Sequence, residues 1–199
     1  MKLKRLVTGA CILLVVAELL LVLVSWMLSA SMTEDVRPLL SNEGVRWFFG
    51  SFTNFLSTPL LVFLLLLSMA WGCLSESGML SGSPLRRSPD SQPRRARRFA
   101  LITLLVYLFF VLALTVIPHA VLLSATGRLL PSPFSRALVA IVSFGIILTA
   151  SVYGLVSRRF TSLSDVVSSL TSGISCAAPL FLLYVLLVQF IESLRFVFL

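Results

Sequence analysis

Long apolar runs alternate with short polar segments along the whole chain. Five runs reach or approach the roughly 20 residues that a helix needs to cross a hydrocarbon core of about 30 Å. They are Leu6 to Leu28, Phe55 to Leu74, Phe99 to Ile117, Phe134 to Val156, and a last run that begins near Ile174 and becomes polar again at Glu192. Because a helix satisfies its own backbone hydrogen bonds in lipid, the pattern predicts an all-α integral membrane protein of about five transmembrane helices.

The polar segments divide the predicted spans into groups. Residues 1–74 are expected to form a two-span unit with a periplasmic loop, and residues 99–199 a three-span unit. Residues 75–98, rich in Arg, Ser and Pro, cannot bury a core and are expected to be a mobile cytoplasmic linker. Between the first two spans, the aromatic residues that follow Arg46 predict a helix lying at the membrane interface.

Composition supports a membrane protein and explains the charge. The chain of 199 residues is 58% hydrophobic and only 12% charged, with a formal net charge of +8. Such a charge could indicate nucleic-acid binding, but the basic residues lie in short blocks beside apolar runs, without interleaved aromatic residues that would stack on bases. We therefore expect no nucleic-acid partner and interpret the charge as a determinant of membrane orientation.

The distribution of basic residues predicts the orientation. With a cytoplasmic amino terminus, eleven of the sixteen basic residues fall on the cytoplasmic side, including Arg94, Arg95, Arg97 and Arg98. Arg and Lys resist translocation, so five spans give a cytoplasmic amino terminus and an external carboxyl terminus in a bacterial inner membrane. The same arginines could dock anionic lipid headgroups, although a role in topology alone is favoured. The first run could also be a cleaved secretory signal, but its length favours a retained anchor.

A few polar residues interrupt the apolar spans. Glu18, near the middle of the first span, is a candidate proton-binding carboxyl, and the alternative that we favour is a glutamate that fixes a helix contact. Glu192 and Arg195 are spaced to pair on one helix face. Asp165 is expected to cap the helix that begins at Val166.

Small residues in the fourth and fifth spans predict close helix packing. Gly and Ser at these positions allow two backbones to approach closely. The candidates are Ser143, Gly145, Gly154 and Gly173. We expect the fourth and fifth spans to pack together, within one chain or across a homodimer, and Gln189 to hydrogen-bond to a neighbouring helix.

The chain offers few residues for catalysis or metal binding. It has three separated cysteines and one histidine, and it shows no Ser-His-Asp, P-loop or paired-carboxylate arrangement. We therefore expect no metal, no cofactor and no enzymatic activity.

Distinctive polar motifs occur in a fixed order along the apolar chain. VRPLLSNEGVRWFFGSFTNF starts at Val36, SESGML follows the second span and ends at Leu80, and PSPFSRALVAIVSFGIILTASVYGLVSRRFTSLSDVVSSL covers Pro131 to Leu170. The run LLVQFIESL ends at Leu194. This order resembles the AbgT family of p-aminobenzoyl-glutamate transporters and related antimetabolite exporters.

The resemblance implies transport of an aromatic acid or folate-related metabolite. The chain also differs from the family pattern. Relative to the family pattern, this chain resembles a reduced member that lacks the central hairpin region and the carboxyl-terminal part. An Asn-Trp pair near the family's substrate falls at Arg195-Phe196 here, and neither residue matches. We assign no substrate-binding residue from the resemblance.

The sequence is compatible with two functions. The first is transport of a p-aminobenzoyl-glutamate-like substrate, in which a partner or a second copy of the chain would supply missing elements. The alternative is a membrane scaffold or modulatory subunit that keeps only the scaffold helices. Flux of labelled substrate in vesicles would discriminate between them.

Overall fold

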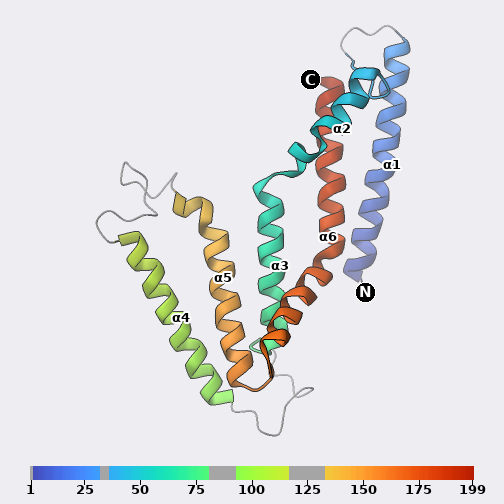
Figure 1. Ribbon diagram of the computed structural model, residues 1–199. Coiled ribbons are helices and arrows are strands. Elements are labelled where there is room, and N and C mark those ends of the chain that lie inside the picture. The colour runs from blue at the N-terminus through green and yellow to red at the C-terminus, as the bar shows by residue number, and fades with distance from the viewer. Residues whose placement is uncertain (1, 32–35, 81–92, 117–132) are drawn as a thin grey trace. The chain divides into compact units, whose positions relative to one another are not determined.

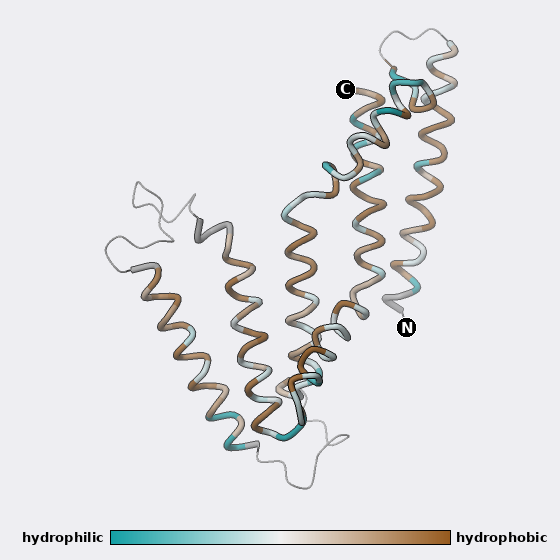
Figure 2. Tube along the Cα trace, viewed as in Figure 1, coloured by the Kyte–Doolittle hydropathy of each residue, from teal (hydrophilic) through white to brown (hydrophobic). Residues whose placement is uncertain are grey.

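A computed structural model of the chain describes residues 2–31, 36–80, 93–116 and 133–199. The described residues form six helices, with the bounds α1 Lys2–Ala30, α2 Asn42–Leu56, α3 Pro59–Ser77, α4 Pro93–Val116, α5 Pro133–Val156 and α6 Leu163–Phe198 (Figure 1). Five of these, all except α2, are long and apolar enough to cross a membrane. Apolar residues predominate along each of the five (Figure 2). The prediction of an all-α membrane protein with five spans is confirmed.

Local sequence explains where α2 and α3 begin. The Ser41 hydroxyl accepts a 3.0 Å hydrogen bond from the Gly44 N–H and so caps α2. Pro59 is the first residue of α3, a position where its missing N–H costs no helix hydrogen bond. The hydroxyl of Tyr184 on α6 bonds to Thr58 and donates to the Leu56 carbonyl at 3.3 Å, which fixes the junction.

Two predicted boundaries differ from the structure. Helix α4 begins at Pro93 rather than at Phe99, so the four arginines predicted in the linker lie in its first turns. Pro at the first position and Arg as a good helix former account for the earlier start. Helix α3 extends to Ser77. The other residues of the predicted linker, 81–92, lie outside the described residues.

The last span also begins earlier than the apolar pattern predicts. Helix α6 is continuous from Leu163 and contains Pro179. Asp165 caps its amino terminus as expected, although the helix begins at Leu163 and not at Val166, so Asp165 lies within the first turn. Its Oδ2 accepts hydrogen bonds from the Thr161 N–H at 2.7 Å and the Ser162 N–H at 3.2 Å. The serines before Ile174 interrupt the apolar run but do not end the helix. A helix within a protein needs no uninterrupted apolar run.

The packing groups the chain into two compact units. The first contains Met1–Val62 and Ala177–Leu199, and the second contains Phe63–Cys176. Leu21, Leu39 and Val197 form the core of the first unit. Cys73, Ala150 and Phe160 form the core of the second. Helices α3 and α6 each contribute residues to both units. The predicted division into residues 1–74, 75–98 and 99–199 stays a prediction.

The outward faces of the long helices are apolar. Side chains such as Leu13 on α1 and Phe109 on α4 are 67% and 75% exposed. A water-soluble protein rarely exposes continuous apolar surface of this kind. Acyl chains of the bilayer would cover these faces.

Candidate functional site

Three polar side chains meet between α1 and α6 in the first unit. The Ser193 hydroxyl donates a 2.6 Å hydrogen bond to Glu18 Oε1. Gln189, one turn earlier on α6, donates from Nε2 to Ser193 Oγ at 3.3 Å. Ser193 is fully buried and Gln189 is 8% exposed. The structure thus brings two predicted residues, Glu18 and Gln189, into one network through a third. The described hydrogen bond of Gln189 lies within α6, whereas the sequence predicted a bond to a neighbouring helix.

The hydrogen-bond directions in this network leave one carboxyl oxygen available. Because the Gln189 amide donates to Ser193, the Ser193 hydroxyl uses its proton for Glu18 Oε1. Glu18 Oε2 is buried and has no hydrogen-bond partner among the described residues. A buried, unpaired carboxylate oxygen is costly in a membrane, so Glu18 is the side chain of this network whose hydrogen bonding is incomplete.

Sequence alone singles out only part of this network. Glu18 is conspicuous as the one acidic residue inside the first apolar run, and Gln189 as an amide in the last. Ser193 is not conspicuous, because serine is common in these spans. The four-residue spacing between Gln189 and Ser193 could have indicated Ser193, because this spacing places both side chains on one helix face.

Gly173 packs against α3 in the second unit. A Cβ on Gly173 would overlap the Ser68 carbonyl oxygen, and it would lie 2.8 Å from the Cα of Gly72. A Cβ on Gly72 would likewise overlap the Ser169 carbonyl oxygen. The two glycines therefore let the backbones of α3 and α6 touch. Gly72 did not emerge from the sequence because it lies alone in an apolar span.

The two glycines of α5 that were predicted to pack helices together lie against aromatic side chains. A Cβ on Gly145 would lie 2.7 Å from the Tyr107 ring on α4, and a Cβ on Gly154 would overlap the Phe160 ring just after α5. Ser143 is fully buried, and its hydroxyl has no partner in the described part of the chain. A contact across a homodimer stays a prediction.

Four arginines that are predicted to set the topology are exposed on the first turns of α4. They are Arg94, Arg95, Arg97 and Arg98. Ala96 and Ala100 on the same helix are buried, at 0% and 1% exposure. No acidic residue lies in this first turn. Four cations at a helix amino terminus oppose the helix dipole, so anions outside the chain, such as lipid phosphates, would favour this arrangement.

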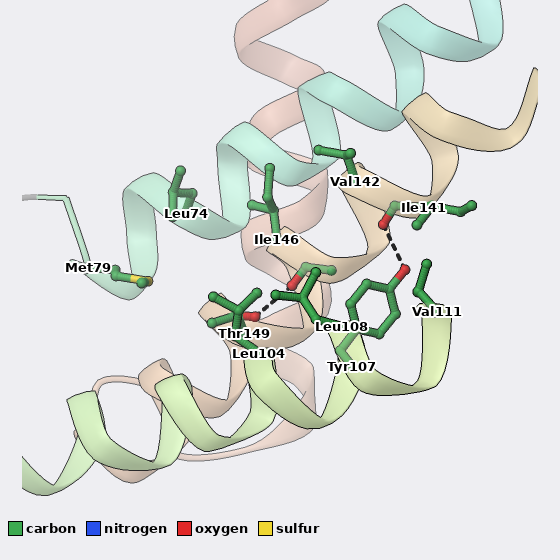
Figure 3. Close-up of a pocket in the computed structure, with 11 residues that line it drawn as sticks. Leu74, Met79, Leu104, Tyr107, Leu108, Val111, Ile141, Val142, Ile146 and Thr149 are labelled. Atoms are coloured by element: carbon green, nitrogen blue, oxygen red, sulfur yellow. Dashed lines mark hydrogen bonds between the residues drawn. The ribbon is translucent and has the colours of Figure 1, made fainter. Parts of the chain in front are cut away.

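An apolar cavity of about 290 Å³ lies between α4 and α5 in the second unit (Figure 3). Leu104, Leu108, Ile146 and other aliphatic side chains line it. Its two hydroxyl groups are already bonded, since Tyr107 donates to the Ile141 carbonyl at 2.7 Å and Thr149 to the Gly145 carbonyl at 2.7 Å. The cavity can accommodate an acyl chain or an apolar ring, and it offers no charge to a ligand.

The described residues offer no cluster for a metal ion. No group of three or more His, Cys, Asp and Glu side chains lies together in the parts of the chain that the structure describes.

Comparison with known proteins places the chain in a family. The model of the AbgT putative transporter family matches residues 87–197, more than half of the chain. The chain belongs to the AbgT family. Searches of curated proteins and of solved structures gave no match.

Membership of the AbgT family confirms the resemblance drawn from the motifs. The matched range contains Gln189 and Ser193 of the network, while Glu18 and the SNEGVRW motif precede it. This AbgT protein is a multi-pass membrane protein of a transporter family. A transporter family favours a non-enzymatic function, as the residue inventory predicted.

Proposed function

We propose that this AbgT protein transports an aromatic acid of the p-aminobenzoyl-glutamate class across a bacterial inner membrane and couples transport to protons through Glu18. The family match supports membrane transport. The observation that carries the coupling is the buried Glu18 Oε2, which has no partner in the described residues although Ser193 holds the neighbouring Oε1.

The network lets Glu18 change protonation while its position stays fixed. The Ser193 bond to Oε1 can persist in both states, because Gln189 orients the Ser193 hydroxyl. A proton on Oε2 neutralises the carboxyl, which removes most of the cost of placing it in lipid. Loss of that proton creates a charge that favours a conformation with access to water. The protonation state thus biases the equilibrium between two conformations, as coupling requires.

The experiment measures accumulation of radiolabelled p-aminobenzoyl-glutamate in proteoliposomes under an imposed pH gradient. The variant is Glu18→Gln, whose amide oxygen keeps the hydrogen bond from Ser193 but cannot take up a proton. The matched control is Glu192→Gln, which changes an acid on α6 whose 2.9 Å ion pair with Arg195 lies at the surface. We expect accumulation in the wild type and in the control, and none driven by pH in Glu18→Gln.

The outcomes discriminate the proposed roles. Flux that is equal in the wild type and Glu18→Gln would leave Glu18 with a packing role and would reject proton coupling through it. Absence of flux in the wild type at any pH would reject autonomous transport and favour the scaffold function.

A further inference from the structure

A polar groove of about 580 Å³ lies between the amino-terminal half of α2 and the end of α6, within the first unit. Arg37, Glu43 and Arg46 supply its charges. Trp47 and Phe196 form an aromatic wall, with ring centroids 4.4 Å apart and the rings stacked. The groove is separate from the Glu18 network, and its residues have no role in the proposed proton coupling.

The local sequence builds this groove. Glu43, Arg46, Trp47 and Gly50 follow the spacing i, i+3, i+4, i+7, so they share one face of α2. Gly44 lets the helix start against the Leu39 backbone, because a Cβ there would overlap the Leu39 carbonyl.

Backbone contacts hold both ends of the groove. The Arg37 N–H donates to the Val197 carbonyl at 3.2 Å, which ties the segment before α2 to the end of α6. Leu39 and Val197 pack in the same core. The segment that carries Arg37 is thus held against the end of α6.

The groove charges are not used within the described chain. Arg37, Glu43 and Arg46 are exposed, and none of the three forms an ion pair with another described residue. Glu43 and Arg46 stay unpaired even though their spacing would allow a pair. A ligand that carries both a negative and a positive group could therefore satisfy all three.

The position of α2 indicates where such a ligand comes from. On this helix the Phe48 ring contacts the rings of Phe49 and Phe52, and Phe49 is 77% exposed. An amphipathic helix with exposed aromatic rings lies at the headgroup level of a bilayer. The groove on this helix would then lie among phospholipid headgroups.

We propose that the groove binds the phosphoethanolamine headgroup of a phospholipid. The guanidinium groups of Arg37 and Arg46 hold the phosphate, for which their geometry is suited. The Glu43 carboxylate accepts hydrogen bonds from the lipid ammonium. The stacked rings of Trp47 and Phe196 line the groove beside that ammonium. A glycerol headgroup has no cation for Glu43, and a choline headgroup has no N–H to donate to it.

Gly50 allows a test that leaves the protein intact. A Cβ on Gly50 would have no described atom within 4 Å, so Gly50→Leu places a side chain in the groove without a clash in the chain. Gly9 on α1 is equally open, and Gly9→Leu is the matched control. Leu favours helix more than Gly by several tenths of a kcal/mol, so neither substitution should unfold its helix.

The experiment is native mass spectrometry of the full chain after exchange into an equimolar mixture of phosphatidylethanolamine, phosphatidylglycerol and phosphatidylcholine. The wild type and Gly9→Leu should retain one phosphatidylethanolamine, and Gly50→Leu should lose it. Glu43→Gln should reduce the preference for phosphatidylethanolamine over phosphatidylglycerol by about tenfold, the value of one charge-assisted hydrogen bond.

Several results would overturn the assignment. Equal retention of the three lipids would mean that the headgroup is not recognised. Retention by Gly50→Leu, or equal loss in Gly9→Leu, would place the lipid elsewhere. Displacement of the lipid by p-aminobenzoyl-glutamate would make the groove a substrate site.

Discussion

At Gly173 the backbone of α6 lies against that of α3, and this contact leaves no room for a side chain. A methyl group would overlap the Ser68 carbonyl oxygen and approach the Cα of Gly72. These neighbours are backbone atoms of helices, so they cannot move aside as a flexible side chain would. The contact should therefore be among the most sensitive points of the second unit.

Gly173→Ala is expected to destabilise the protein by about 1–3 kcal/mol, the usual cost of overpacking. The measurement is the temperature at which half of the detergent-solubilised protein leaves the monodisperse peak in size-exclusion chromatography. Gly9→Ala is the control, since a methyl group there meets no described atom within 4 Å and Ala favours helix over Gly. Equal midpoints for the two variants would contradict the contact.

Single residues were predictable from sequence where their chemistry contrasts with their surroundings. Glu18 and Gln189 stand out in apolar runs, and Asp165 stands in a capping position. Ser193 and Gly72 could not be predicted in the same way, because their roles depend on which helices are neighbours. Glu18 and Ser193 are 175 positions apart, and no local pattern specifies that contact.

Among the elements, the start of α4 combines a helix amino terminus with the largest cluster of exposed cations in the described chain. Its four arginines lie where the helix dipole disfavours positive charge. Their position is explained if they remain on the cytoplasmic side, because transfer of Arg across the membrane is disfavoured. The arginines on this helix would then set its orientation.

Replacing Arg94, Arg95, Arg97 and Arg98 by Gln should give a mixed orientation, since the predicted cytoplasmic count falls from eleven to seven. Reporter fusions placed between α3 and α4 measure the side on which this segment lies. The same four positions changed to Lys form the control, because Lys keeps the charge. An unchanged orientation in the Gln variant would show that charge bias is not the determinant.

Element boundaries were predicted least well where polar residues continue a helix. The apolar pattern placed the last span near Ile174, whereas α6 begins at Leu163 with a capped amino terminus. Likewise α4 includes arginines that hydropathy assigns to a loop. Hydropathy reports the part of a helix that lies in hydrocarbon, and the helix itself extends to its caps.

For the whole molecule, the number of long apolar helices and the family were both predictable. The length rule for spans is strict, because unsatisfied backbone in lipid is costly. The later polar motifs fall within residues 87–197, which the family model matches. The grouping into two units was not predictable. It depends on α3 and α6 each contributing residues to both units, which the pattern of one chain does not encode.

The central claim is that proton binding at Glu18 accompanies movement of an aromatic acid. The most direct test is the luminal pH of proteoliposomes loaded with pyranine, followed when p-aminobenzoyl-glutamate is added outside. The wild type and Glu192→Gln should show a change in luminal pH on addition, and Glu18→Gln should show none. An equal pH change in Glu18→Gln, or substrate uptake by the wild type without any pH change, would contradict the account.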